Sequence, residues 1–152
     1  MPTVPALQNT GPFVAAATFC EKVLTEASGA VSLIRVTDTI NQAVMGSDAP
    51  REMQPFMANI TLVVMLKSGS AKGQYGLMVR PEAPSGEQMP PFEVTIQLQG
   101  DAWGANVVAP MQFPVTMPGV YWFDVLLTEP TTDVPGQFLT RVPLDVVYQR
   151  VG

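Results

Sequence analysis

Strict alternation of apolar and polar residues is the strongest pattern in this sequence. It is clearest over residues 92–99, where every second residue is apolar and the residues between them are polar. Because successive side chains of a β-strand point to opposite faces of a sheet, this alternation predicts a strand with one face buried and the other in solvent. Residues 56–66 carry apolar side chains on both faces, so we expect that segment to lie in the middle of a sheet.

Six further segments have a similar strand-like pattern: 13–20, 31–40, 74–80, 107–115, 120–127 and 137–149. They are separated by stretches rich in Gly, Pro, Ser and Asp, which favour turns. About eight short strands at this spacing predict an all-β protein, and we expect a single antiparallel β-sandwich. Only residues 21–27 are compatible with a short helix, and residues 39–45 are a weaker candidate for a helical turn.

The chain has 152 residues, which is enough to bury a hydrophobic core in one domain. We therefore expect one β-sandwich domain over residues 1–152, with residues 1–12 as an extended N-terminal arm. Residues 1–5 contain no cationic segment of the kind that begins a signal peptide, and no apolar run approaches the length of a membrane span. A cytoplasmic protein, or one assembled into a particle from the cytoplasm, is expected.

The composition argues against several kinds of chemistry. The sequence has no His and one Cys, so His-dependent nucleophilic catalysis, His-ligated zinc and multi-Cys metal sites are excluded. The formal net charge is −5 and the few Lys residues form no basic stripe, so nucleic acid is not an expected partner. We predict no cofactor, no metal and no catalytic residue.

Residues 118–125, with the sequence PGVYWFDV, resemble the entry to the penultimate strand of immunoglobulin-like sandwiches. In that motif a Tyr, here Tyr121, hydrogen-bonds to upstream backbone, and Phe123 occupies the position of the usual core Cys. The order of this segment with residues 19–21, 29–40 and 139–144 also resembles a family of small bacterial and phage-associated immunoglobulin-like β-sandwich proteins of unknown function. That resemblance implies a fold and no chemistry.

Asp124 interrupts an apolar run and shares a strand face with Val120, Trp122 and Leu126. A buried and unpaired carboxylate would be unfavourable, so we expect Arg35 or Arg141 to pair with it across neighbouring strands. The alternative is an acid that faces a ligand.

The nine Met residues are numerous for this length. Thioether side chains fill irregular cores, but they are also common at adaptable binding surfaces. Ordinary packing beneath loops is one interpretation, and an interaction surface is the other. The residues proposed for that surface are Met53, Met89, Trp103, Met111 and Met117.

Six carboxylates fall near predicted loops, namely Asp38, Asp48, Glu52, Asp101, Asp124 and Asp133. They form no recognised calcium-binding motif, and Asp at turns usually caps the turn itself, although an acid pair or a calcium site is an alternative. Cys20 has no His to activate it, so we interpret it as a small buried side chain.

These observations favour a non-enzymatic protein-interaction or structural module, whose partner is another protein or a second copy. Self-association through an edge strand is plausible, with residues 74–80 or 137–149 as the proposed edge. The first alternative is a subunit of a phage-like or other repetitive assembly. The second is a carboxylate- or cation-dependent enzyme or a carbohydrate-binding module.

Overall fold

A computed structural model describes residues 11–129 and 136–152, and among these the regular structure is entirely β. The seven strands are β1 (Phe13–Thr25), β2 (Val31–Val36), β3 (Thr39–Met45), β4 (Phe56–Glu82), β5 (Phe92–Val115), β6 (Gly119–Thr128) and β7 (Gln137–Val151). The helix considered for residues 21–27 is absent, because β1 continues through Thr25. There Val23 pairs with Leu33 of β2, and this strand pairing overrides the local helical preference.

The strand count differs from the predicted eight because some segments merge and one divides. β4 joins the predicted strands 56–66 and 74–80, while β5 joins 92–99 and 107–115. The glycines between the predicted strands bend the chain without ending it, as at Gly69 (φ 59°) in β4 and Gly100 (φ 87°) in β5. Conversely, segment 31–40 divides into β2 and β3 near residues 37–38.

All seven strands belong to one hydrogen-bonded sheet, with the order β2-β1-β4-β6-β7-β3 and with β5 paired to β4. The first half of β4 lies between β1 and β5, as predicted for residues 56–66, and its second half lies between β6 and β5. The prediction of a purely antiparallel arrangement is wrong, because β3 runs parallel to β7. Among the described residues the strands also form one continuous hydrogen-bonded sheet instead of two separate sheets.

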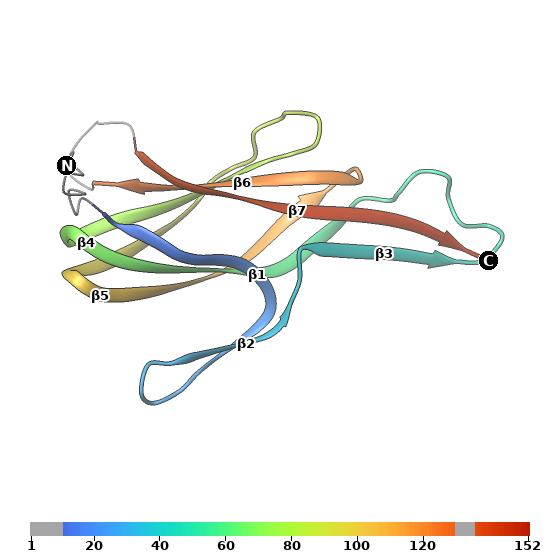
Figure 1. The fold of residues 1–152 in the computed structure, drawn as a ribbon. Coiled ribbons are helices and arrows are strands. Elements are labelled where there is room, and N and C mark those ends of the chain that lie inside the picture. Colours follow the sequence, from blue (N-terminus) through green and yellow to red (C-terminus); the bar gives the residue numbers. More distant parts are fainter. Residues whose placement is uncertain (1–10, 130–135) are drawn as a thin grey trace, which may run out of the picture.

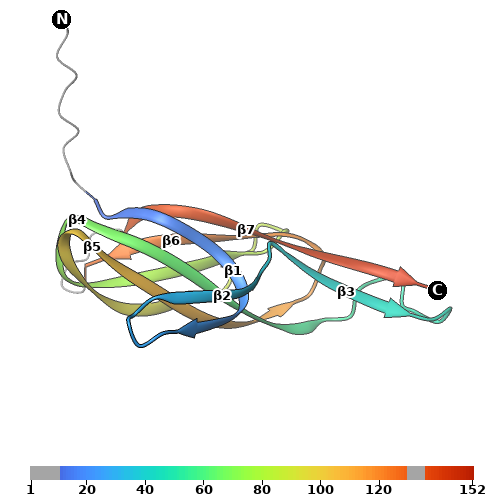
Figure 2. The same cartoon turned by 60° about the horizontal axis from the view of Figure 1, so that its bottom comes forward.

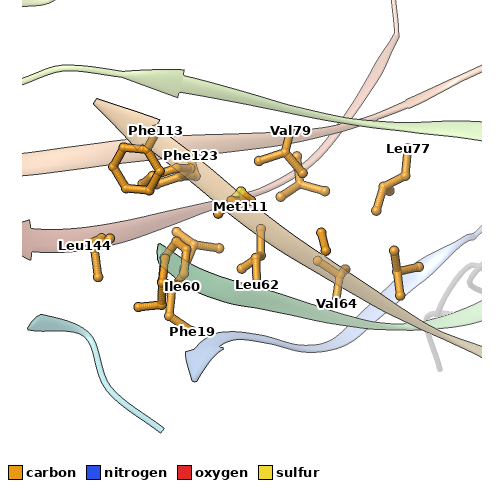
Figure 3. Packing of buried hydrophobic residues seen from close by; sticks show 14 of the residues in the cluster. Phe19, Ile60, Leu62, Val64, Leu77, Val79, Met111, Phe113, Phe123 and Leu144 are labelled. Atoms are coloured by element: carbon orange, nitrogen blue, oxygen red, sulfur yellow. The ribbon is translucent and has the colours of Figure 1, made fainter. Parts of the chain in front are cut away.

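The sheet curls because β4 and β5 bend together, and its inner face encloses one core (Figure 1). Phe19, Phe113 and Phe123 lie at one end of this core, and the ring of Phe123 has its centroid 5.0 Å from Phe19 and 5.4 Å from Phe113. Aliphatic side chains such as Leu62 and Leu77 continue the core along β4 (Figure 3). Ile96 and Leu98, from the apolar face predicted for residues 92–99, are also buried in this core, so alternation identified the inner face of that segment.

Neither segment proposed as a free edge is an outer strand. Residues 74–80 lie in β4, which has β5 on one side and β6 on the other. β7 pairs with β6 along its first half and with β3 along its second half. The outer strands among the described residues are β2, β3 and β5. The prediction of the edges failed because periodicity identifies the faces of a strand and not its neighbours.

Two-stranded ribbons project from the curled body (Figures 1 and 2). The β1–β2 hairpin extends on the side opposite β6 and β7, and the β3–β7 pair extends toward the C-terminus. No helix in residues 11–129 and 136–152 is long and apolar enough to cross a membrane. Of the predicted N-terminal arm, residues 1–10 lie outside the described residues, as do residues 130–135.

Candidate functional site

The outer face of β4, β6 and β7 carries side chains in three rows that run across the strands. The inner face of β6 is set by Tyr121, Phe123 and Val125, which are buried, so the alternate residues of β6 point outward. Register places Arg80 opposite Asp124 and Asp124 opposite Arg141. We call these rows the outer patch; they are Met78–Leu126–Phe138, Arg80–Asp124–Arg141 and Glu82–Trp122–Pro143.

The central row is an ion-pair network around Asp124, whose side chain is only 16% exposed. Arg141 Nε lies 3.0 Å from Asp124 Oδ1, and Arg80 Nη2 lies 3.6 Å from Asp124 Oδ2. Arg141 Nη2 also donates a 2.8 Å hydrogen bond to Glu82 Oε2. The Nε–Oδ1 contact lacks hydrogen-bond geometry, so within the described chain Asp124 Oδ1 has no hydrogen-bond donor.

The predicted Asp124–Arg141 pair is therefore present, whereas Arg35 pairs with Glu21 instead, at 3.2 Å. Arg80 and Glu82 were not anticipated as part of this network. They lie more than 40 residues before Asp124 and Arg141 in the sequence, and only the pairing register brings them together. Arg80 and Glu82 are two residues apart on one strand, so the sequence could predict that they share a face. It could not predict which residues of a neighbouring strand they contact.

Aromatic side chains border the charged row. The guanidinium carbon of Arg141 lies 4.7 Å from the ring centroid of Trp122, which is within the range of a cation–π interaction. Trp122 remains 37% exposed and Phe138 57% exposed. Two ion-pair partners and an aromatic ring thus fix the orientation of Arg141 at the surface.

Tyr121 and Phe123 have structural positions on the opposite, inner side of β6. Tyr121 Oη donates a 2.8 Å hydrogen bond to the carbonyl oxygen of Met117, which is the upstream backbone contact that the immunoglobulin-like motif implies. Burial raises the pKa of the Tyr121 phenol. Phe123 is fully buried and packs between Phe19 and Phe113.

The five residues considered for a Met-rich interaction surface differ widely in their exposure. Met53 and Met111 are buried in the core, Met89 packs against it half-buried, and Met117 is also half-buried. Only Trp103 is well exposed, at 63%. The loop that contains Met53 is long but folds back onto the body, which loop composition alone could not reveal.

Small apolar cavities lie beside the loop between β4 and β5. One of about 210 Å³ is lined in part by Met89, Pro114 and Tyr121, and another of about 160 Å³ by Met89, Pro114 and Phe92. Among the residues that line the two, Glu87 is the single carboxylate. Both are smaller than the roughly 300–1,000 Å³ of ordinary small-molecule sites.

The predicted carboxylates do not assemble in the part of the chain that the structure describes, where no group of three or more His, Cys, Asp or Glu side chains could hold a metal ion. Asp133 lies outside that part. Cys20 is buried beside the junction of β1, β2 and β4, and burial raises the pKa of its thiol. This environment keeps the thiol protonated near neutral pH and disfavours reactivity.

Comparison of the sequence with protein-family models found no match, and comparison with curated proteins found none either. Among solved structures, the chain is similar to the CARDB domain of a Pyrococcus furiosus protein in complex with di-metal ions. The identity is 13% and the TM-score 0.41, with 95% of this chain and 100% of that chain covered.

It is also similar to an immunoglobulin-like protein from Pseudomonas aeruginosa. That identity is 17% and the TM-score 0.41, with 91% of this chain and 98% of that chain covered. At these TM-scores the likeness assigns no residue role, ligand or partner to this chain.

Proposed function

We propose that this protein is a non-enzymatic interaction or structural module that binds another protein through its outer patch. The observation that carries the proposal is the ordered Arg141–Trp122 pair at the surface, bordered by exposed apolar side chains. Trp and Arg are enriched among the residues that dominate binding energy at protein interfaces. Phe138 and Val120 add apolar surface on either side of the pair.

The restricted conformation of the Arg141 side chain also favours binding. Association normally requires long side chains to lose rotamer freedom, which opposes binding. Arg141 has already lost much of this freedom, since it is held by Glu82 at 2.8 Å and by Asp124 at 3.0 Å. A partner that contacts Trp122 and Arg141 would therefore meet a preorganised surface.

In architecture, we propose an immunoglobulin-like sandwich in which the bent β4–β5 hairpin contributes to both layers. One layer would hold β2, β1 and the first half of β4, and the other would hold the second half of β4 with β6, β7 and β3. The hydrogen bond from Tyr121 to Met117 and the shared core between the halves support this interpretation. The lone buried Cys20 is compatible with a reducing compartment such as the cytoplasm.

Site-specific photo-crosslinking in the source cell tests the binding surface. A benzophenone amino acid replaces Phe138 in one variant and Gln99 in another; both positions are exposed on β-strands, and Gln99 is outside the outer patch. We expect protein adducts from position 138 and few from position 99. Equal yields at both positions, or none at position 138, would refute the assignment of the outer patch.

A subunit of a repetitive assembly is the second candidate. The β1–β2 hairpin favours it, because within residues 11–129 and 136–152 β2 pairs with β1 alone and its far edge has no neighbouring strand. Both proposals hold together if the protein that binds the outer patch is a second copy of this chain.

A further inference from the structure

The β1–β2 hairpin exposes aliphatic side chains on one face. Register pairs Lys22 with Ile34 and Cys20 with Val36, and Leu24 lies on the same face because it is two residues beyond Lys22. Leu24 is 46% exposed, Ile34 42% and Val36 57%. We call Lys22, Leu24, Ile34 and Val36 the hairpin face.

This hairpin is poorly supported by its own chain. A two-stranded ribbon is at best marginally stable in water unless a third strand or a packed face supports it. The ribbon extends away from β6 and β7 in both views (Figures 1 and 2), so it does not cover the outer patch of its own copy. Exposed aliphatic side chains gathered on such a ribbon are typical of a surface that another molecule covers.

The first row of the outer patch is the complementary surface. Register extends this row by one residue, because Met78 lies opposite Glu93 of β5 as well as opposite Leu126. The extended row therefore has three apolar side chains and one carboxylate, while the hairpin face has three aliphatic side chains and one ammonium group. Lys22 and Glu93 are both exposed, and neither has an ion-pair partner in residues 11–129 and 136–152.

We propose that the hairpin face of one copy docks on the extended row of a second copy, with Lys22 of the first placed near Glu93 of the second. This inference rests on the proposed function, in that it names the protein that the outer patch binds. Charge complementarity favours this unlike pairing over a symmetric one. A pairing of two hairpin faces would offer Lys22 no opposite charge from the partner's face, and a pairing of two rows would offer none to Glu93.

The contact is heterologous, so each bound copy still has one free hairpin face and one free row. Such contacts generate a closed ring when the rotation between copies closes and an open chain of copies when it does not. The wild-type protein should therefore form a concentration-dependent series or one defined ring. It should not stop at an open dimer.

The test uses sedimentation velocity on the full chain over a hundredfold concentration range in reducing buffer. Ile34→Asp and Phe138→Asp are each expected to weaken association roughly tenfold or more, because each places a carboxylate in an apolar contact. Met45→Asp is the matched control, since Met45 is 80% exposed on the other ribbon. It should associate like the wild type, and circular dichroism should show that all three variants are folded.

Mixing the two variants distinguishes a heterologous contact from a symmetric one. Ile34→Asp retains a working row and Phe138→Asp retains a working hairpin face. At a concentration at which neither variant associates alone, the mixture should therefore form a 1:1 dimer and nothing larger. A mixture that stays monomeric would overturn the proposal, and so would a wild type that is monomeric throughout.

Charge reversal at Lys22 and Glu93 provides a second test of the contact. Lys22→Glu and Glu93→Lys should each weaken association about two- to fivefold, as expected for an exposed ion pair, and the double variant should restore it. Failure of the self-association proposal leaves the proposed function standing if the crosslinker at position 138 captures a different protein. Absence of any adduct there would remove both.

Discussion

Arg141 and Asp124 lie directly opposite each other on β7 and β6, with Arg141 Nε 3.0 Å from Asp124 Oδ1. The Asp124 side chain is 16% exposed while that of Arg141 is 43% exposed. The carboxylate is thus largely shielded from water and depends on the two guanidinium groups, from Arg80 and Arg141, that approach it. The same contact holds Arg141 over Trp122, so the stability of β6–β7 and the order of the outer patch are linked.

Asp124→Ala should therefore lower the free energy of unfolding by about 1–3 kcal/mol, since among the described residues it leaves Arg80 with no ion-pair partner and Arg141 with Glu82 alone. Urea denaturation followed by Trp fluorescence measures this change. Adding Arg141→Ala to form a double-mutant cycle should give a coupling energy above about 0.5 kcal/mol.

The exposed pair of Glu21 and Arg35 is the matched control for this measurement. Its side chains are 55% and 72% exposed, so Glu21→Ala should change stability by less than about 1 kcal/mol. An Asp124→Ala variant as stable as the wild type would show that the central row does not stabilise the fold.

Tyr121→Phe should lower the free energy of unfolding by about 0.5–1.5 kcal/mol at neutral pH, because it removes the hydrogen bond to the Met117 carbonyl. It should also reduce the loss of stability in alkali. Burial raises the pKa of Tyr121 in the folded state, so the unfolded chain releases this proton first. Stability is therefore lost as the pH rises above the unfolded value of about 10.

Urea denaturation at a series of pH values between neutral and alkaline tests the second effect. Tyr75→Phe, which changes a half-buried Tyr on β4, is the control and should retain the alkaline loss of the wild type. The raised pKa of Cys20 contributes a similar loss in every variant and cancels in the comparison. Parallel curves for Tyr121→Phe and the wild type would contradict the role of Tyr121.

Alternation in the sequence predicted the buried faces of the strands well. On β5 it separates the apolar residues of segment 92–99 from the polar residues between them, and Ile96 and Leu98 of that apolar face are buried in the core. It could not predict strand neighbours, because a period of two residues fixes faces and leaves pairing open. For that reason the predicted edges at 74–80 and 137–149 were wrong. The expectation of eight strands was wrong for a different reason, because glycines such as Gly69 and Gly100 bend β4 and β5 without ending them.

The candidate site was predicted only in part, again because alternation leaves strand pairing open. Asp124 could be identified because it is a carboxylate within an apolar strand. Its pairing with Arg141 could be proposed because a buried carboxylate without a cationic partner is unfavourable. Arg80 and Glu82 had no comparable local signal. For Met53 and Met111 the sequence left core packing and a binding surface open, because flexible apolar side chains suit both, and their burial in the structure favours core packing.

Cys20 should react slowly with a disulfide reagent in the folded protein. Its side chain is fully buried, and burial raises the pKa of the thiol, so little thiolate is present or accessible. We expect labelling by dithionitrobenzoate to be at least about a hundredfold slower in buffer than in guanidinium chloride, because it requires local opening. Rapid labelling of the native protein would show that the junction of β1, β2 and β4 opens readily.

Gly69→Ala should destabilise the bend of β4 by more than backbone conformation alone explains. Gly69 has φ 59°, where an L-residue is disfavoured by roughly 1–2 kcal/mol. An added Cβ would also lie 2.9 Å from both the Gly11 Cα and the Phe13 ring, so this packed corner would have to shift.

Gly29→Ala is the control, because Gly29 also has a positive φ of 89° but nothing lies within 4 Å of its Cβ position. Thermal unfolding should show the larger loss for Gly69→Ala, by about 1–3 kcal/mol, since overpacking adds to strain. Equal losses would mean that the corner at Gly11 yields freely, and that the tight bend does not depend on the lack of a side chain at Gly69.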